Sequence, residues 1–256
     1  MTKAEFELIP GSAQSGILLV CDHAANALPE GYGALGLHDR LLATHIAYDI
    51  GAAEVTRALA GIFGAPAVLA CWSRLLIDLN RGADDPTLVM KLSDGSIIPG
   101  NAGVDAAEIA HRIAKFHLPY HAAIRAELAA LTGVPVILSI HSFTPAWKGK
   151  PRPWQVGVLW DRDDRLAIPL IKRLQEVGFN VGDNEPYTGE LENDTLYQHA
   201  TMAGLPHVLI EIRQDLIATP EAALEFAARL APILKTALAD MGPATIKFTR
   251  GERKHV

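Results

Sequence analysis

Cysteine, apolar leader segments and long hydrophobic runs are scarce or absent in this sequence of 256 residues. The two cysteines, Cys21 and Cys71, are too few for a disulfide framework and lie within or beside apolar runs, so we expect buried, reduced thiols. The first ten residues include Glu5 and Glu7 and lack the apolar core of a signal peptide. No window approaches the roughly 20 apolar residues of a membrane span. These absences predict a cytoplasmic protein without a membrane partner.

Clustered positive charge is also lacking. The chain has 23 Lys and Arg against 29 Asp and Glu, a formal net charge of −6. Its one dense basic stretch, Arg250–Lys254, lies at the extreme C-terminus. Nucleic-acid surfaces need clustered Lys and Arg to displace counterions, so we expect no nucleic-acid partner. What the chain does have is ten histidines and 49% hydrophobic residues, enough for a sizeable core.

Short apolar runs alternate with long helical patterns along the chain, which is typical of an α/β fold. We therefore expect a three-layer α/β/α sandwich with a mostly parallel or mixed central sheet. One domain should span residues 1–256, with 1–15 and 243–256 as peripheral tails. Strands are expected over residues 17–21, 66–70, 134–140, 154–160, 179–181 and 207–212, and helices over 38–63, 104–131, 165–177 and 220–241.

Polar clusters follow the predicted strands, where open α/β sheets bind ligands. His23 follows the first strand and His141 the third, while Glu211 and Arg213 share one side of the last. Two imidazoles and an oxygen ligand suit a catalytic zinc that keeps one position for water. A separate carboxylate can then take the proton of that water, and an arginine such as Arg81 can recognise a substrate carboxylate. Together these residues indicate a metallohydrolase.

The segment Cys21–Pro29 resembles the opening motif of the N-formylglutamate amidohydrolase family. The resemblance runs in order from about residue 17 to about residue 240. It implies hydrolysis of N-formyl-L-glutamate to formate and L-glutamate, and hence a small acidic amino-acid derivative as partner. The further matching segments are 47–49, 78–81, 119–121, 139–143, 184–187 and 210–215.

Several segments are also similar to the zinc carboxypeptidases, and this likeness implies the fold of zinc-dependent exopeptidases, a phosphorylase/hydrolase-like sandwich. It implies one zinc ion held by His23 and His141, a carboxylate site at Asn80 and Arg81, and Glu211 as general base. That family has a glutamate three residues after the first histidine, where this chain has Asn26. A neutral amide is a poor zinc ligand. The third ligand therefore stays open between Asn26, Asp22 and Asp49, and Asp22 could instead hold the second ring nitrogen of His23.

Other side chains are assigned to the substrate. Arg74 is expected to be a second anion contact, and Arg213 either assists the anion site or orients Glu211. The loop 182–189 would bring the Tyr187 hydroxyl near the scissile amide. Two alternatives remain: a hydrolase of another N-acyl amino acid or of a peptide C-terminus, and a metal-free ligand-binding relative without activity. The sequence does not indicate an oligomeric state, so a homo-oligomer stays open.

Overall fold

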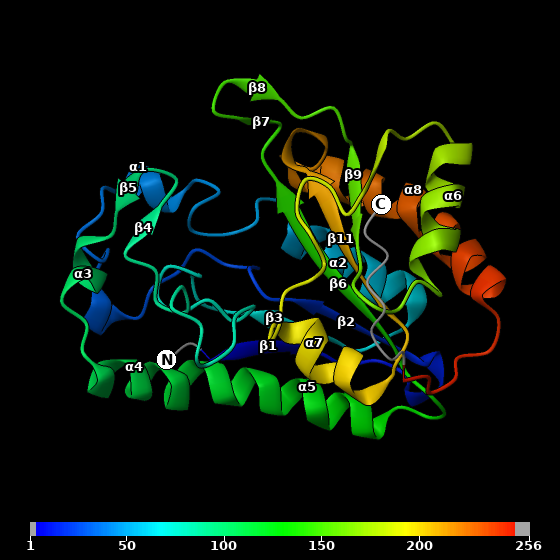
Figure 1. Ribbon diagram of the computed structural model, residues 1–256, viewed down its shortest axis with the longest axis horizontal. Helices are drawn as coiled ribbons and strands as arrows, with labels where there is room; N and C mark the ends of the chain where they lie inside the picture. The colour runs from blue at the N-terminus through cyan, green and yellow to red at the C-terminus, as the bar shows by residue number, and fades with distance from the viewer. Residues whose placement is uncertain (1–3, 249–256) are drawn as a thin grey trace.

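A seven-stranded mixed sheet forms the centre of the computed structural model, which describes residues 4–248 (Figure 1). The strand order is β1-β3-β2-β6-β11-β9-β10. Neighbouring strands are parallel from β3 to β11, whereas β1 and the β9–β10 pair run antiparallel to the rest. The strands are β1 (Phe6–Ile9), β2 (Ile17–Cys21), β3 (Ala67–Ala70), β6 (Val136–Phe143), β9 (Val156–Leu159), β10 (Val181–Asp183) and β11 (His207–Arg213).

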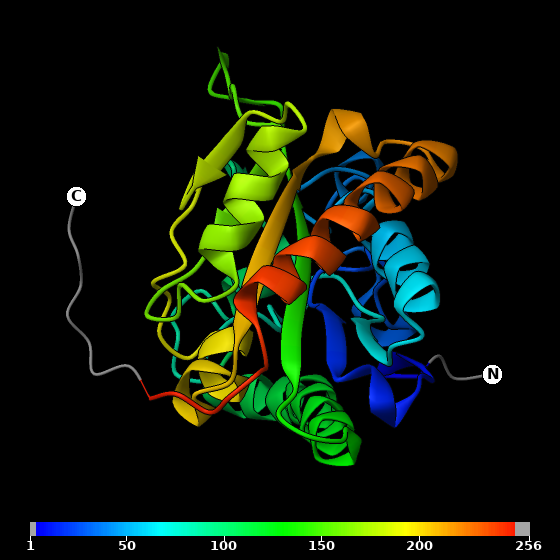
Figure 2. The same cartoon turned by 90° about the vertical axis from the view of Figure 1, so that its right-hand side faces the viewer.

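Helices cover both faces of this sheet, which confirms the predicted α/β/α sandwich. One layer contains α2 (Ala52–Phe63), α6 (Ala167–Glu176) and α8 (Pro220–Met241), which lie in front of the sheet in Figure 2. The opposite layer contains α5 (Leu118–Ala130), which packs on β2 and β3, and α7 (Thr195–His199), which packs on β11. The predicted start of α8 is present: Thr219 caps the helix by accepting from the backbone N–H of Ala222, and Pro220 follows. No helix within residues 4–248 is both long and apolar enough to cross a bilayer.

Shorter elements complete the described chain. Two small hairpins, β4–β5 and β7–β8, project from the carboxyl edge of the sheet (Figure 1). The hairpin strands are β4 (Leu92–Ser93), β5 (Ser96–Ile97), β7 (Ala146–Trp147) and β8 (Lys150–Pro151). The short helices are α1 (Asp39–Leu42), α3 (Pro99–Ala102), α4 (Ala106–Arg112), η1 (Ala13–Ser15), η2 (Glu30–Tyr32), η3 (Ile113–His117), η4 (Thr201–Ala203) and η5 (Gln214–Leu216).

The single helix predicted over residues 38–63 is wrong. The chain is helical only in α1 and α2, and residues 43–51 between them form turns. Gly51 starts α2 with φ of +79°, and a Cβ atom there would lie 2.1 Å from the carbonyl oxygen of Ile217. The backbone N–H of Asp49 donates to the carbonyl of His23 instead of to a helix. Tertiary contacts thus override the helical pattern and carry Asp49 to the carboxyl edge of the sheet.

The helical stretch predicted over 104–131 is present. It consists of α4 and α5 joined by the π-helical turn η3, which ends just before Pro119, where a backbone N–H is missing. One other expectation needs correction. Residues 1–15 are not simply a tail, because Phe6–Ile9 forms the edge strand β1 against β3. At the other end, Lys247 donates a backbone hydrogen bond to Gly204, and Arg250–Lys254 lies outside the described residues.

Candidate metal centre and its cavity

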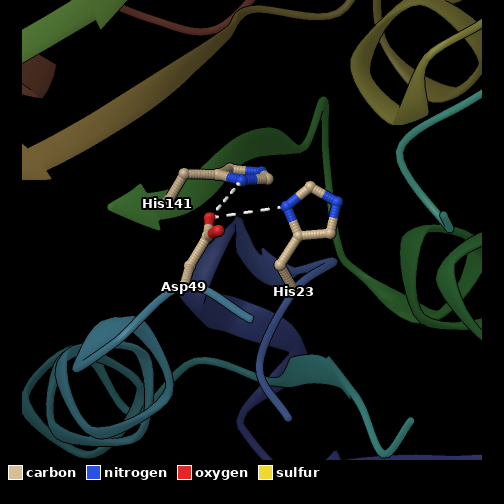
Figure 3. Close-up of side chains that lie close together, drawn as sticks. All are labelled: His23, Asp49 and His141. Atoms are coloured by element: carbon tan, nitrogen blue, oxygen red, sulfur yellow. Dashed lines mark hydrogen bonds and ion pairs between the residues drawn. The ribbon is translucent and has the colours of Figure 1, made fainter. Parts of the chain in front are cut away.

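Three buried side chains meet at the carboxyl edge of the sheet: His23 just after β2, His141 within β6, and Asp49 just before α2 (Figure 3). Asp49 Oδ2 lies 2.9 Å from His141 Nδ1 and 3.4 Å from His23 Nδ1. One ligand atom from each residue lies within 4.8 Å of the other two, so the three can hold one metal ion. The structure brings together the two histidines that the strand-end argument placed at this edge, and Asp49 is the acid that lies between them.

Each histidine is held from behind by a second carboxylate. Asp78 Oδ1 lies 2.7 Å from His23 Nε2, and Asp22 Oδ2 lies 3.2 Å from His141 Nε2. A carboxylate on the far ring nitrogen fixes the tautomer of a metal-binding histidine and increases its basicity. Of the two roles left open for Asp22, neither is seen: Asp78 holds the second ring nitrogen of His23, and Asp22 holds His141. Both Nδ1 atoms consequently face the shared space beside Asp49.

Negative charge dominates this region. Asp22, Asp49 and Asp78 are at most 4% exposed. Burial alone would raise the pKa of Asp78, but Arg74 and His23 hold this pKa well below its usual range. Likewise, burial opposes ionisation of Asp22, yet His141 lowers its pKa to about 2. Three ionised carboxylates around two histidines make an environment that favours a bound cation.

The residues fit a divalent metal by two further observations. His23 Nδ1 is a buried ring nitrogen without a hydrogen-bond partner among the described residues. Two imidazole nitrogens and one carboxylate oxygen also form the donor set of catalytic zinc sites, which keep a further position for water or substrate. A buried ring nitrogen without a hydrogen-bond partner costs folding free energy, and a ligand between it and the Asp49 carboxylate would remove that cost.

Glu211 lies beside this cluster on β11, directly opposite His141 in the parallel ladder. Its Oε2 atom is buried and has no hydrogen-bond partner within the described chain. Burial raises the pKa of Glu211 to about 7. Gly157 faces Glu211 from β9, and a Cβ there would lie 3.2 Å from the Glu211 Cβ. Glu211 is thus a spatially confined carboxyl group that can exchange a proton near neutral pH.

The three candidate ligands and Glu211 line one cavity of about 270 Å³, which is also lined by the predicted carboxylate-binding residues. Asn80 Oδ1 accepts a hydrogen bond from the Thr195 backbone N–H, while Arg81 donates to the Asn80 carbonyl and to Thr87. Arg81 forms no ion pair with any described residue, so its charge is available to a ligand. Arg74 also lines the cavity, but its guanidinium binds Asp78 at 2.7 Å.

Tyr187 lies at the rim of the cavity and is 45% exposed, with the Arg152 guanidinium 5.1 Å from its ring centroid. Its placement is compatible with substrate contact. Two other predicted site residues are not brought to the cluster. Asn26 donates its side-chain amide to the Leu42 carbonyl and lines a different hollow. Arg213 binds Asp215 at 2.7 Å and the carbonyl of Trp154, and it is not among the cavity-lining residues.

Sequence reasoning missed two contacts: that of Asp78 with the Nε2 of His23, and that of Asp22 with the Nε2 of His141. Asp78 begins the Asp-Leu-Asn-Arg segment singled out in the sequence, so its position beside the carboxylate-binding pair was the available signal. Asp22 also accepts from Tyr120 and Thr195, which come from α5 and α7. No sequence spacing connects those helices to β2, so the contacts of Asp22 could not be predicted without the folded structure.

His117 and His121, one helical turn apart, are both buried and contact the segment that carries Asn80 and Arg81. His117 Nε2 lies 2.9 Å from the Arg81 carbonyl, and His121 Nε2 lies 3.1 Å from the Leu79 carbonyl. His121 also contacts His199 at 2.8 Å. These contacts fix the backbone of the segment that presents Asn80 and Arg81.

Comparisons with known proteins give the family and the fold of the chain. A sequence model of the family described as N-formylglutamate amidohydrolase matches residues 15–218. The crystal structure of a gene product from Agrobacterium tumefaciens is 35% identical, with a TM-score of 0.88, over 93% of this chain and 96% of that one. The structure of N-formylglutamate amidohydrolase from Ralstonia eutropha is 21% identical, with a TM-score of 0.66, over 92% of this chain and all of that one, a likeness of fold. The search of curated proteins gave no match.

Proposed function

Since this chain belongs to the N-formylglutamate amidohydrolase family, we propose that it hydrolyses the amide bond of an N-acyl amino acid with the help of one zinc ion. The family's name makes N-formyl-L-glutamate the first substrate to test, with formate and L-glutamate as products. The observation that supports the proposal most directly is the meeting of His23, Asp49 and His141 with the unpaired carboxyl oxygen of Glu211 in one cavity.

Zinc held by His23 Nδ1, Asp49 Oδ2 and His141 Nδ1 would polarise the scissile carbonyl and make a water molecule more acidic. Asp78 and Asp22, bonded to the two Nε2 atoms, would keep both imidazoles oriented with their Nδ1 atoms toward the metal. Glu211 takes the proton of the attacking water and then delivers it to the leaving nitrogen. Because Glu211 gives up the proton that it took, its carboxylate is ionised again after one turnover.

Arg81 and Asn80 would hold the substrate's carboxylate. The Arg81 guanidinium supplies a planar, bidentate donor, and its position is fixed by its own bonds to the Asn80 carbonyl and Thr87. Placing the substrate in this way lowers the entropic part of the barrier. Arg74 is assigned a supporting role, because its charge is already compensated by Asp78.

The test is a Glu211→Gln variant loaded with zinc. We expect turnover to fall by about 10²–10⁴-fold, because the amide cannot accept a proton, while metal content stays near that of the wild type. Glu192→Gln is the matched control, since Glu192 is exposed in the loop before α7. A Glu211→Gln protein with wild-type kcat would remove the general base from the proposal.

A further inference from the structure

The cavity extends well beyond the proposed catalytic groups. Glu211, Leu209 and His207 alternate along β11, so they share one face of the sheet, and all three line the cavity. Four residue steps of a strand span about 13 Å. The cavity therefore runs along β11 from the carboxyl edge of the sheet toward the start of this strand.

The inner part of the cavity, which we call the inner pocket, is formed by Leu159, Leu196, Tyr197, Thr201, His207 and Leu209. Its walls are apolar: Leu159 is the cross-strand partner of Leu209, and Leu196 faces them from α7. These three leucines are 3–7% exposed.

The far end of the inner pocket is polar but uncharged. His207 is 2% exposed, its Nδ1–H donates to the Leu205 carbonyl, and its Nε2 accepts from the Thr201 hydroxyl. Burial lowers the pKa of His207, so the imidazole is neutral. Asp161 and Asp194 also line the cavity. Among its described lining residues, Arg81 is the one Lys or Arg that has no ion pair. A substrate carboxylate in the inner pocket would be buried without a cation.

The direction in which a substrate enters follows from Arg81 and Asn80. Asn80 Oδ1 accepts from the backbone N–H of Thr195, the residue directly before Leu196 in the pocket wall. The Arg81 guanidinium donates to the Asn80 carbonyl, so a carboxylate held by these two residues would lie beside this wall of the inner pocket. From Glu211 to Leu209 the strand rises about 7 Å, which is enough for the scissile amide and the α-carbon. From Leu209 to His207 it rises about 7 Å more, and this length is left for the substrate's side chain.

We propose that the inner pocket binds the side chain of the amino acid whose amide is cleaved, and that it selects a long uncharged side chain, such as that of methionine or phenylalanine, over that of glutamate. The inference rests on the proposed hydrolysis of N-acyl amino acids and narrows its substrate class. This side chain differs from that of the substrate in the family's name. Among the described residues that line the cavity, Arg81 alone offers an unpaired guanidinium, and Arg152 lies outside the lining, beside Tyr187. One guanidinium serves one carboxylate, whereas N-formyl-L-glutamate carries two.

The first test compares N-formyl-L-methionine, N-formyl-L-phenylalanine and N-formyl-L-glutamate as substrates of the zinc-loaded protein, by release of free amine. We expect kcat/KM to be at least tenfold higher for the two uncharged side chains. An equal or higher value for the glutamate derivative would overturn the inference and leave the proposed hydrolysis standing.

A binding measurement separates the two proposals if turnover is absent. Calorimetry on the Glu211→Gln variant compares the Kd values of the same methionine and glutamate derivatives. Tighter binding of the methionine compound by at least tenfold supports the inner pocket even if the wild type hydrolyses neither, a result that would refute the hydrolysis. Equal binding, tighter binding of glutamate, or no binding of either would refute the inner pocket.

A set of variants locates the selectivity. Thr201 is partly exposed on η4, and Thr201→Phe should shorten the inner pocket. It also removes the hydroxyl bond to His207, so Thr201→Val, which removes the same bond without adding bulk, is measured beside it. We expect the ratio of kcat/KM for N-formyl-L-methionine over N-formyl-L-alanine to fall at least tenfold. The neighbouring Met202→Phe is the control, because Met202 is 58% exposed and does not line the cavity. An unchanged ratio in Thr201→Phe, or an equal fall in Thr201→Val or Met202→Phe, would contradict the assignment.

Discussion

Asp78 offers the sharpest test of how the candidate metal centre is built. Its carboxylate is fully buried and bonds to His23 Nε2 at 2.7 Å, Arg74 at 2.7 Å and the Asn80 backbone N–H at 3.0 Å. Asp78→Asn keeps the shape but replaces one oxygen with an N–H donor. Because His23, Arg74 and the backbone N–H all donate toward Asp78, the new amide must face at least one donor with a donor.

The expected magnitude has two parts. Loss of the carboxylate behind a metal-binding histidine weakens metal affinity by about 10–100-fold, or roughly 1.4–2.8 kcal/mol. Breaking a buried ion pair by removing one partner costs about 3–5 kcal/mol. The lower end applies here, about 3 kcal/mol, because the Arg74 side chain keeps 21% of its exposure and a second acid, Asp49, lies 3.7 Å away.

Zinc affinity is measured by competition with a chromophoric chelator, and stability by denaturant unfolding of the metal-free protein. Asp94→Asn is the control: Asp94 pairs with His45 at 3.1 Å but is 38% exposed, so the zinc Kd should change less than about twofold. The reasoning is refuted if Asp78→Asn binds zinc as tightly as the wild type while folding normally. It is also refuted if the two variants weaken zinc equally.

Three further outcomes are expected. Chelator treatment should remove about one zinc per chain and lower the Tm, since a metal at 100 times its Kd stabilises the fold by roughly 2.7 kcal/mol; no Tm change on reloading would argue against the site. Asn26→Ala should retain zinc, measured by elemental analysis, whereas Asp49→Ala should lose it; the reverse result would restore the amide as ligand. Arg112 is 2% exposed, and Arg112→Leu leaves its buried partners unpaired, so the free energy of unfolding should fall by about 3–5 kcal/mol. The exposed Arg57→Leu should lower it by less than about 1 kcal/mol. Equal losses in the two arginine variants, read from urea unfolding, would contradict that burial argument.

The strands were the predictable part of the fold. Ile17–Cys21 is buried at every position, as a continuous apolar run in a parallel sheet should be, and it is a strand at the predicted residues. The helix boundaries were less predictable, because they depend on distant contacts. Residues 43–51 have helical spacing, yet the close approach of Gly51 to Ile217 and the bond from Asp49 to the His23 carbonyl hold them in turns.

The candidate site divides in the same way. His23, His141 and Glu211 could be grouped from sequence because parallel strands end at one edge of the sheet. Asn26 was a reasonable third ligand by its spacing, but the amide turns toward Leu42. Asp49 could not be preferred over it, since its position depends on turns that local sequence does not specify. The sequence therefore grouped the two histidines and left the acid beside them undecided.

The buried acids at this edge connect stability with the proposed activity. Asp22, Asp49 and Asp78 are compensated by His141, His23 and Arg74, although apolar residues of similar volume would commonly fill such buried positions at no cost or with a gain. Removing one acid alone is unfavourable, because Arg74 or a histidine then loses its partner. The charges are therefore interdependent, and a divalent cation among them would offset their repulsion while joining β2, β6 and the turn before α2. On this reasoning the metal-free protein should be least stable at the edge of the sheet that its proposed chemistry requires.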